Sequence, residues 1–343
     1  MPLSPETLLT KAAKAGASDV HIVVGQPPLF RIDGELVHQG TAKITKAVSE
    51  QFIKSVIGSA NFQRLKTDRE IDVSHQLKNG IRLRVNCHYE RGNVGFAARI
   101  IPTDIPNIEG IGLTEEMQGL CNLSEGLILF TGPTGAGKST SMAAMINYIN
   151  QERAENIITL EDPIEFIFPA GKGIVRQRQF GDDFLSFGEA LRRVLRQDPN
   201  VIMVGEMRDL ETIAAALTLA ETGHLIIATL HTPNAVQSID RIIDVFPPHQ
   251  QSQIRTQLSF SLRAVIAQQL LPAAEGGRVA VRECLLSTPA VSNIIRDSRL
   301  QELKSVIQSN SSIGMCTFEQ DAKRLLKEGA IDKDTYEWVV SAV

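Results

Sequence analysis

The stretch GPTGAGKST, residues 132–140, constrains the fold of this chain more than any other feature. Gly132 is followed after four residues by Gly137, Lys138 and Ser139, which is the spacing of a phosphate-binding loop. Such a loop lies between a buried strand and a helix, because glycine amides and the helix N-terminus together bind phosphate oxygens. The apolar run GLILFTG precedes it and a helical pattern follows. We therefore predict an α/β nucleotide-binding domain, with a glycine turn that binds no ligand as the alternative.

Further apolar runs predict the sheet of this domain. NIITLED, NVIMVGE and HLIIATLHT are nearly continuous apolar segments, as expected of parallel strands covered by helices on both faces. DLETIAAALTLAETG, between the last two, predicts a helix that Asp209 caps and Gly223 ends. From about residue 273 the chain is polar, and we predict a helical region there.

Two domains are expected from the length of 343 residues. Proline and glycine are frequent in IIPTDIPNIEGIGL, so residues 102–113 are predicted to be a linker. Residues 1–101 show the short alternating runs of a small α+β domain, and residues 114–343 carry the phosphate-loop pattern. In GIRLRVNCHYERGN, apolar residues alternate with Arg82 and Arg84, which by alternation alone are a solvated strand face.

Composition narrows the possible partners and location. The net charge of −4 offers no basic surface for a phosphate backbone, so nucleic acid is not an expected partner. The sequence shows no secretory leader and no apolar stretch long enough to span a membrane, so no direct membrane insertion is expected. The four cysteines form no CxxC pair, which favours a reducing, cytoplasmic location.

Carboxylates are expected beside the phosphate loop, because a nucleoside triphosphate is bound with Mg²⁺. Glu206 follows the strand VIMV after one glycine and is the candidate metal acid, and Ser139 is the candidate hydroxyl ligand. Glu161, Asp162 and Glu165 follow another strand, and Pro163 places them in a loop at its carboxyl end. Acids this close repel one another unless Mg²⁺ or a proton is bound, and a solvated acidic turn is the alternative.

Two histidines flank the last apolar run, HLIIATLHT. His224 precedes this strand and His231 follows it, so the two are expected at opposite ends of the sheet. Because ligands bind at the carboxyl ends of parallel strands, we predict that His231 senses nucleotide. His224 is expected to support structure or a contact between subunits, and for either residue a structural core histidine is the alternative.

Taken together, these motifs resemble the ATPases of type IV pili and type II secretion, with the pilus-retraction branch the most similar. The resemblance rests on GPTGAGKST, ITLEDPIEF, RQDPNVIMVGEMRDLET and AETGHLIIATLHT, with GASDVH, RIDG, DRIIDVFP, QIRTQLSFSL and GMCTFEQ in addition. It covers nearly the whole chain. It implies a PAS-like N-terminal domain, a RecA-like P-loop NTPase domain and a homo-hexameric ring.

The resemblance also implies roles for single residues. Glu165 becomes the base that activates water, Glu206 holds Mg²⁺ through water, and Arg82, Arg84 and Arg99 approach the phosphates. The loop pattern itself predicts that Lys138 contacts the β- and γ-phosphates, and Glu161, Asp162, His224 and Arg208 are expected to be supporting residues. ATP is expected to bind the whole loop: Gly132, Pro133, Thr134, Gly135, Ala136, Gly137, Lys138, Ser139 and Thr140.

These expectations describe a Mg²⁺-dependent ATPase motor at the cytoplasmic face of the inner membrane, removing pilin subunits beside a membrane platform protein. The family's extension ATPases carry an extra N-terminal domain and a tetracysteine site, which this sequence lacks. In AVSNIIRD, Ser292 and Asp297 depart from the element typical of retraction ATPases. An accessory retraction ATPase or a nucleotide-binding regulatory subunit, working with a paralogous pilus ATPase, is therefore the alternative. A RecA-like DNA translocase is a more distant one, disfavoured by the net charge.

Overall fold

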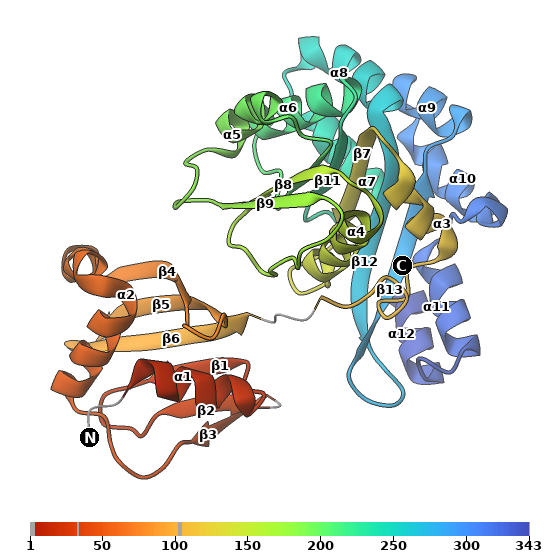
Figure 1. The fold of residues 1–343 in the computed structure, drawn as a ribbon. Helices are drawn as coiled ribbons and strands as arrows, with labels where there is room; N and C mark the ends of the chain where they lie inside the picture. Colours follow the sequence, from red (N-terminus) through yellow and green to blue (C-terminus); the bar gives the residue numbers. More distant parts are fainter. Residues whose placement is uncertain (1–3, 33, 102–104, 343) are drawn as a thin grey trace. The chain divides into compact units, whose positions relative to one another are not determined.

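The computed structural model describes residues 4–32, 34–101 and 105–342, and the chain forms two compact units, Met1–Asp104 and Ile105–Val343. Residues 102–104 of the predicted linker lie outside the described residues. Each unit has its own sheet and its own hydrophobic core (Figure 1). In the part of the chain that the structure describes, no helix is both long and apolar enough to cross a bilayer.

The first unit is a six-stranded antiparallel sheet packed against two helices. Its strands follow the order β3-β2-β1-β6-β5-β4, and its core joins α1 and α2 to the sheet, with Phe52 of α2 edge-on to Phe96 of β6 at 5.3 Å. β5 and β6 form an antiparallel hairpin that pairs along the whole length of β5. The elements are α1 Pro5–Lys14, β1 Asp19–Ile22, β2 Leu29–Ile32, β3 Glu35–His38, α2 Lys46–Asp68, β4 Glu70–Gln76, β5 Arg82–Glu90 and β6 Asn93–Ile101.

The second unit is built on a seven-stranded sheet with the order β13-β12-β7-β11-β10-β8-β9. Every neighbouring pair is parallel except β12 and β13, which form an antiparallel hairpin. The strands are β7 Gly126–Thr131, β8 Asn156–Glu161, β9 Ile174–Gln179, β10 Val201–Val204, β11 Leu225–Thr229, β12 Leu262–Pro272 and β13 Arg278–Leu286. The four predicted apolar strands are therefore confirmed as β7, β8, β10 and β11.

Helices cover both faces of this sheet, as predicted. In β7, Leu127 and Leu129 pack into a core with α5 to α10, whereas Ile128 and Phe130 pack into a second core with α3 and α4. The period of two along the strand distributes apolar side chains to both cores. The helices are α3 Glu115–Gly119, α4 Lys138–Glu152, α5 Phe187–Val194, α6 Leu210–Glu221, α7 Ala235–Asp244, α8 Pro248–Ser261, α9 Pro289–Arg296, α10 Leu303–Ser309, α11 Phe318–Lys327 and α12 Lys333–Ala342, with 3-10 turns Leu120–Asn122, Leu195–Gln197, Leu300–Glu302 and Ser311–Ile313.

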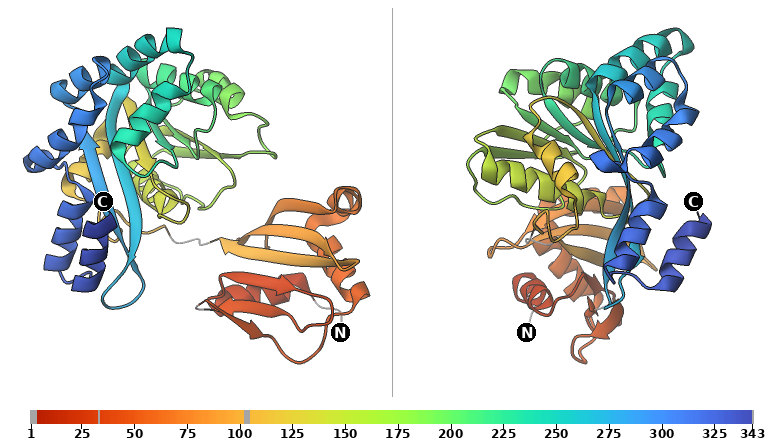
Figure 2. Two further views of the ribbon diagram at one scale, coloured as in Figure 1. Left: turned by 180° about the vertical axis from the view of Figure 1, so that it is seen from behind. Right: turned by 90° about the vertical axis from the view of Figure 1, so that its right-hand side faces the viewer.

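The predicted helical region from about residue 273 is wrong at its start. β13 occupies residues 278–286, and helices begin only at Pro289. Figure 2 shows β12 and β13 as long neighbouring arrows, with α11 and α12 beside them. The sequence pattern did not predict this strand because two of its residues, Arg282 and Glu283, are charged, although both are buried in the structure. Charged residues are almost never fully buried unless they are paired, so a polar pattern favoured a surface region.

Candidate nucleotide site

The phosphate-loop pattern folds into the expected strand–loop–helix arrangement. β7 ends at Thr131, α4 begins at Lys138, and Gly137 caps the helix in the left-handed region with φ 83°. Gly132 and Gly135 also have positive φ, at 138° and 81°. The first amides of α4 have no partner within the helix, and they add a partial positive charge to the loop. This geometry fits an anionic phosphate group.

Lys138 is buried, and its ammonium lies against the loop itself. Nζ donates to the carbonyl oxygens of Gly132 at 2.7 Å and Pro133 at 3.0 Å. Burial lowers the pKa of Lys138, while the carboxylates of Glu206 and Glu165 act in the opposite direction. The structure therefore brings together the loop lysine and the two acids that the sequence singled out. Ser139 and Thr140 lie in the first turn of α4.

Glu206 follows β10, and its carboxylate contacts the side chains of Arg208 and His231. Arg208 Nε donates to Glu206 Oε1, and His231 Nε2 lies 3.2 Å from the same oxygen. Burial opposes ionisation of Glu206, but the hydrogen bond and charge of Arg208 and the neighbouring His231 outweigh it and lower the pKa. His231 thus contacts the predicted metal acid at the carboxyl end of the sheet.

The three acids after β8 do not form one exposed cluster, which corrects the prediction for Glu161. Glu161 is the last residue of β8 and is 5% exposed, whereas Asp162 and Glu165 are exposed in the following loop. Its carboxylate accepts hydrogen bonds from Thr159 Oγ1 at 2.6 Å and Gln177 Nε2 at 3.0 Å. Burial raises the pKa of Glu161, against the effect of these bonds and of one from the Glu165 backbone. Glu161 therefore fixes the start of the acidic loop.

Hydroxyl groups beneath the site were missed by the sequence reasoning. Thr229 donates to the carbonyl oxygen of Gly205, the residue before Glu206. Thr131 bonds to the backbone and hydroxyl of Thr232, and Thr232 continues to Ser238 at 2.7 Å. Threonine at the end of an apolar strand was the available signal, but its partners are remote in sequence. These bonds join the ends of β7, β10 and β11 at one edge.

His224 lies at the other end of β11, as predicted from its place in the sequence. Its Nδ1 is 3.2 Å from the carbonyl oxygen of Leu219 in the last turn of α6. Asp209 caps the first turn of the same helix by accepting from the Thr212 amide at 2.8 Å, and Gly223 has φ 94° after its end. The contact of His224 is thus with the C-terminal end of α6.

The three predicted arginines belong to the first unit and share one face of its sheet. Arg84 of β5 lies directly opposite Arg99 of β6, and Arg82 is two residues away on the same face. Arg99 Nε donates to Asp19 Oδ1 at 2.9 Å, and this carboxylate offsets the repulsion between the facing guanidinium groups.

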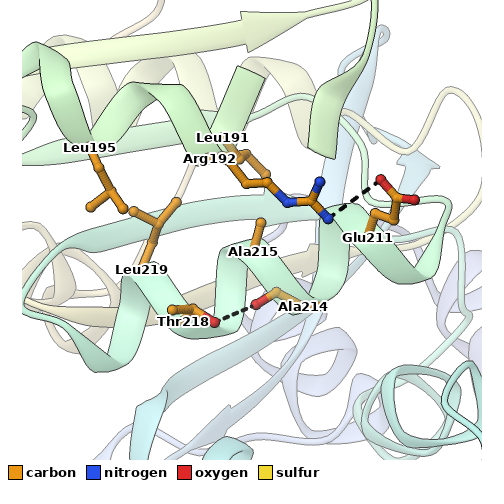
Figure 3. A pocket seen from close by; sticks show the side chains of 8 residues that line it. All are labelled: Leu191, Arg192, Leu195, Glu211, Ala214, Ala215, Thr218 and Leu219. Carbon is orange, nitrogen blue, oxygen red and sulfur yellow. Dashed lines mark hydrogen bonds and ion pairs between the residues drawn. The ribbon is translucent and has the colours of Figure 1, made fainter. Parts of the chain in front are cut away.

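A separate hollow of about 190 Å³ lies between α5 and α6 (Figure 3). Leucines 191, 195 and 219 line it, and Arg192 pairs with Glu211 at 3.6 Å on one side. None of the predicted site residues lines this hollow. It has one ion pair and mostly apolar walls, without the converging amides that phosphate requires.

The described part of the chain has no cluster of side chains that would enclose a metal ion. Among residues 4–32, 34–101 and 105–342, no group of three or more His, Cys, Asp or Glu side chains is placed to hold an ion. Mg²⁺ in nucleotide sites takes one or two protein oxygens, substrate phosphates and water. Ser139 and Glu206 stay the candidates that the sequence offers for such a pair of oxygens.

Comparison with known proteins places these features in a family. The family model described as "Type II/IV secretion system protein" matches residues 2–332. The chain is 41% identical to the type IV pilus retraction ATPase PilT of Pseudomonas aeruginosa, over 95% of each chain. It is also 41% identical to the type IV pilus ATPase PilU of that organism, over 97% of this chain and 86% of the relative.

A solved structure extends the match to three dimensions. The pilus retraction motor PilT with bound ADP superposes with a TM-score of 0.92 at 42% identity, covering 98% of this chain and 97% of the other. This agreement confirms the fold class predicted from the sequence, a RecA-like P-loop NTPase domain preceded by a small α+β domain. It also confirms the family resemblance.

Proposed function

The chain belongs to the type II/IV secretion system protein family, and from this premise we propose that it is a Mg²⁺-dependent ATPase that powers type IV pilus retraction. The observation that carries the proposal is the match of the whole chain to the retraction motor, which was solved with ADP. The phosphate loop, with Glu206 and Glu165 near Lys138, supports nucleotide hydrolysis independently of that match.

In this proposal the loop residues 132–140 bind the phosphates of ATP. Lys138 Nζ, which donates to the carbonyl oxygens of Gly132 and Pro133, then donates to β- and γ-phosphate oxygens. It either gives up the two carbonyl bonds or keeps part of them beside the phosphate bonds. Ser139 and Glu206 would hold Mg²⁺, Glu206 through water, and bound Mg²⁺ would supply positive charge beside the phosphates. Catalysis then depends on positioning and electrostatic stabilisation more than on covalent chemistry.

Glu165 is the proposed base for the attacking water. It is exposed in the loop after β8, as is Asp162, so a water molecule reaches its carboxylate. His231 and Arg208 act through Glu206, because both contact its carboxylate. A ligand at the metal position competes with these contacts, which gives His231 a physical means of reporting on bound nucleotide.

We propose further that six copies form a ring at the cytoplasmic face of the inner membrane. Arg82, Arg84 and Arg99 supply positive charge to the phosphates, and rotation about residues 102–113 is the mechanical step that acts on a membrane platform protein. A second, paralogous pilus ATPase could drive retraction together with this ring.

The test combines purified protein with cells. Lys138→Ala should weaken ATP binding and reduce steady-state hydrolysis by about 10²-fold or more, because it removes a preorganised cation from the developing charge. A strain without this chain should lose pilus retraction, and wild type but not Lys138→Ala should restore it. Near-normal turnover by Lys138→Ala contradicts the loop assignment, and unaffected retraction in the deletion strain contradicts the motor.

An accessory retraction ATPase is the second candidate. Ser292 and Asp297 in AVSNIIRD, which depart from the element typical of retraction ATPases, support it. The distinguishing measurement is retraction in a strain whose other pilus ATPases are deleted. A principal motor retains retraction there, whereas an accessory subunit does not.

A further inference from the structure

A buried arginine joins the sheet to the segment at which the second unit starts. Arg282 of β13 is 2% exposed, and its guanidinium donates to three oxygens. Two of these are the carbonyls of Ile111 and Gly112, at 2.7 and 2.9 Å. The third is Oε1 of Gln268 on the paired strand β12, at 3.0 Å from Arg282 Nε.

Gln268 in turn contacts the phosphate loop and the helix after it. Its side chain is buried, Nε2 donates to the carbonyl oxygen of Ala136 at 2.6 Å, and Oε1 accepts from Ser141 Oγ at 2.8 Å. The Gln268 backbone is equally close, because a Cβ on Gly132 would lie 2.2 Å from its carbonyl oxygen. Two side chains therefore connect the loop to residues 111–112.

The charge on Arg282 is retained in this position. Burial lowers the pKa of Arg282 to about 10, and Asp321 is the main group that opposes the shift. Asp321 accepts from the Arg282 amide at 2.7 Å and pairs with Arg324 at 2.8 Å. At neutral pH the guanidinium is thus a cation with neutral acceptors. In a medium of low dielectric, such hydrogen bonds are strong and costly to break.

We propose that Gln268 and Arg282 are positioning residues that transmit the state of the phosphate loop to residues 105–113. When nucleotide binding shifts the Ala136 carbonyl, Gln268 is drawn with it, because its amide is bonded at both ends. Arg282 then moves or releases the carbonyls of Ile111 and Gly112. By sequence, this segment leads to the first unit, so the linkage gives hydrolysis a route to the mechanical step. The inference rests on the proposed ATPase function.

The test is amide hydrogen exchange of the full chain, free and with Mg²⁺ plus ADP or a non-hydrolysable ATP analogue. In the wild type, nucleotide should slow exchange in residues 132–141 and also in residues 105–113. In Arg282→Met, nucleotide should still slow exchange in residues 132–141. The slowing in residues 105–113 should be smaller than in the wild type by about fivefold or more, the size expected for a coupling between sites. Turnover should fall with little change in KM for ATP, because binding at the loop is retained.

Two further variants serve as a control and as a second test of the linkage. Arg278→Gln changes an exposed arginine on the same strand and should preserve both effects. Gln268→Glu removes the donor to Ala136 but retains an acceptor for Arg282, so it should uncouple residues 105–113 even if Arg282→Met fails to fold. Wild-type coupling in either variant, or no nucleotide effect at residues 105–113 in the wild type, overturns the proposal. Absence of any nucleotide effect at residues 132–141 would instead overturn the proposed function.

Discussion

Glu165 is exposed to solvent and its charge acts on Lys138. Glu161 is buried, Glu206 is bound by Arg208 and His231, and Asp162 is exposed but is not among the charges that act on Lys138, so Glu165 is the candidate base. Glu165→Gln should leave ATP bound and slow hydrolysis by about 10²-fold, the effect of losing a general base. Nucleotide affinity and turnover are measured together. A parallel loss of affinity would mean that Glu165 holds the metal and that Glu206 is the next candidate base.

The two histidines flanking β11 should differ in kind. His231→Ala should lower turnover and reduce the discrimination between ATP and ADP, because His231 contacts Glu206 at the ligand edge. His224→Ala removes a contact with the last turn of α6 and should lower the melting temperature or shift the oligomer profile. ATPase rate, the ATP/ADP affinity ratio and native mass are compared for both. Equal behaviour, or loss of discrimination in His224→Ala alone, contradicts the assignment.

Glu161 should make the free energy of unfolding depend on pH. Burial raises its pKa above the ordinary 4.5, so the folded state binds this proton more tightly than the unfolded state. The stabilisation is full below the unfolded pKa and is lost as the pH rises through the folded pKa. Glu161→Gln removes this loss, and its unfolding free energy should exceed that of wild type more at pH 8 than at pH 4.

Denaturant unfolding at the two pH values measures the effect. Glu35→Gln, a change on the exposed strand β3, is the control and should leave the pH dependence as in wild type. An equal pH dependence in Glu161→Gln and wild type would mean that the Glu161 carboxyl titrates alike in the folded and unfolded states.

At the scale of elements, β12 determines how tightly the phosphate loop is held. Gly132 and Gly135 both have positive φ, but a Cβ at Gly135 meets nothing within 4 Å, whereas one at Gly132 meets the Gln268 backbone. Gly135→Ala should therefore cost about 1–2 kcal/mol of unfolding free energy, from backbone strain alone. Gly132→Ala should cost clearly more, because β12 or the loop must also move.

Unfolding without nucleotide separates this effect from contacts with the ligand. A similar loss of unfolding free energy in the two alanine variants would show that β12 moves away from the loop at little energetic cost. The same result would weaken the inference that Gln268 responds to small shifts of the loop.

At the scale of the whole molecule, the arginine face of the first unit offers a test of ring formation. If Arg84 acts on the nucleotide of a neighbouring subunit, Arg84→Ala and Lys138→Ala inactivate different halves of a shared site. Random mixing at equal amounts should leave about one quarter of such sites intact, since each half is wild type in half of the subunits. Co-expressed mixtures should therefore recover ATPase activity that neither variant has.

Arg64→Ala is the matched control, because Arg64 is an exposed arginine of the same unit and pairs only with Asp68 among the contacts described for it. It should leave turnover unchanged. Mixed assemblies of full native mass without recovered activity would place the action of Arg84 within its own subunit, or exclude it from catalysis.

The sequence alone determined the main elements of the nucleotide-binding domain. The glycine spacing of GPTGAGKST, four apolar strands and the capped helix after Asp209 are local patterns, and each specifies its structure within a few residues. The order of strand and loop also placed His231 and Glu206 at the ligand edge, because carboxyl ends of parallel strands coincide. The roles of the site residues and the boundaries 1–101, 102–113 and 114–343 stay predictions.

Only the tertiary structure decided which charged residues lie inside. Glu161 was expected in a loop and is buried in β8, and the strand containing Arg282 and Glu283 was expected to be helical. Burial of a polar side chain depends on its partners, because an unpaired one is costly in the interior. For Arg282 these partners, Gln268 and the carbonyls of Ile111 and Gly112, lie 14 to 171 residues away in sequence. No local pattern contains that information.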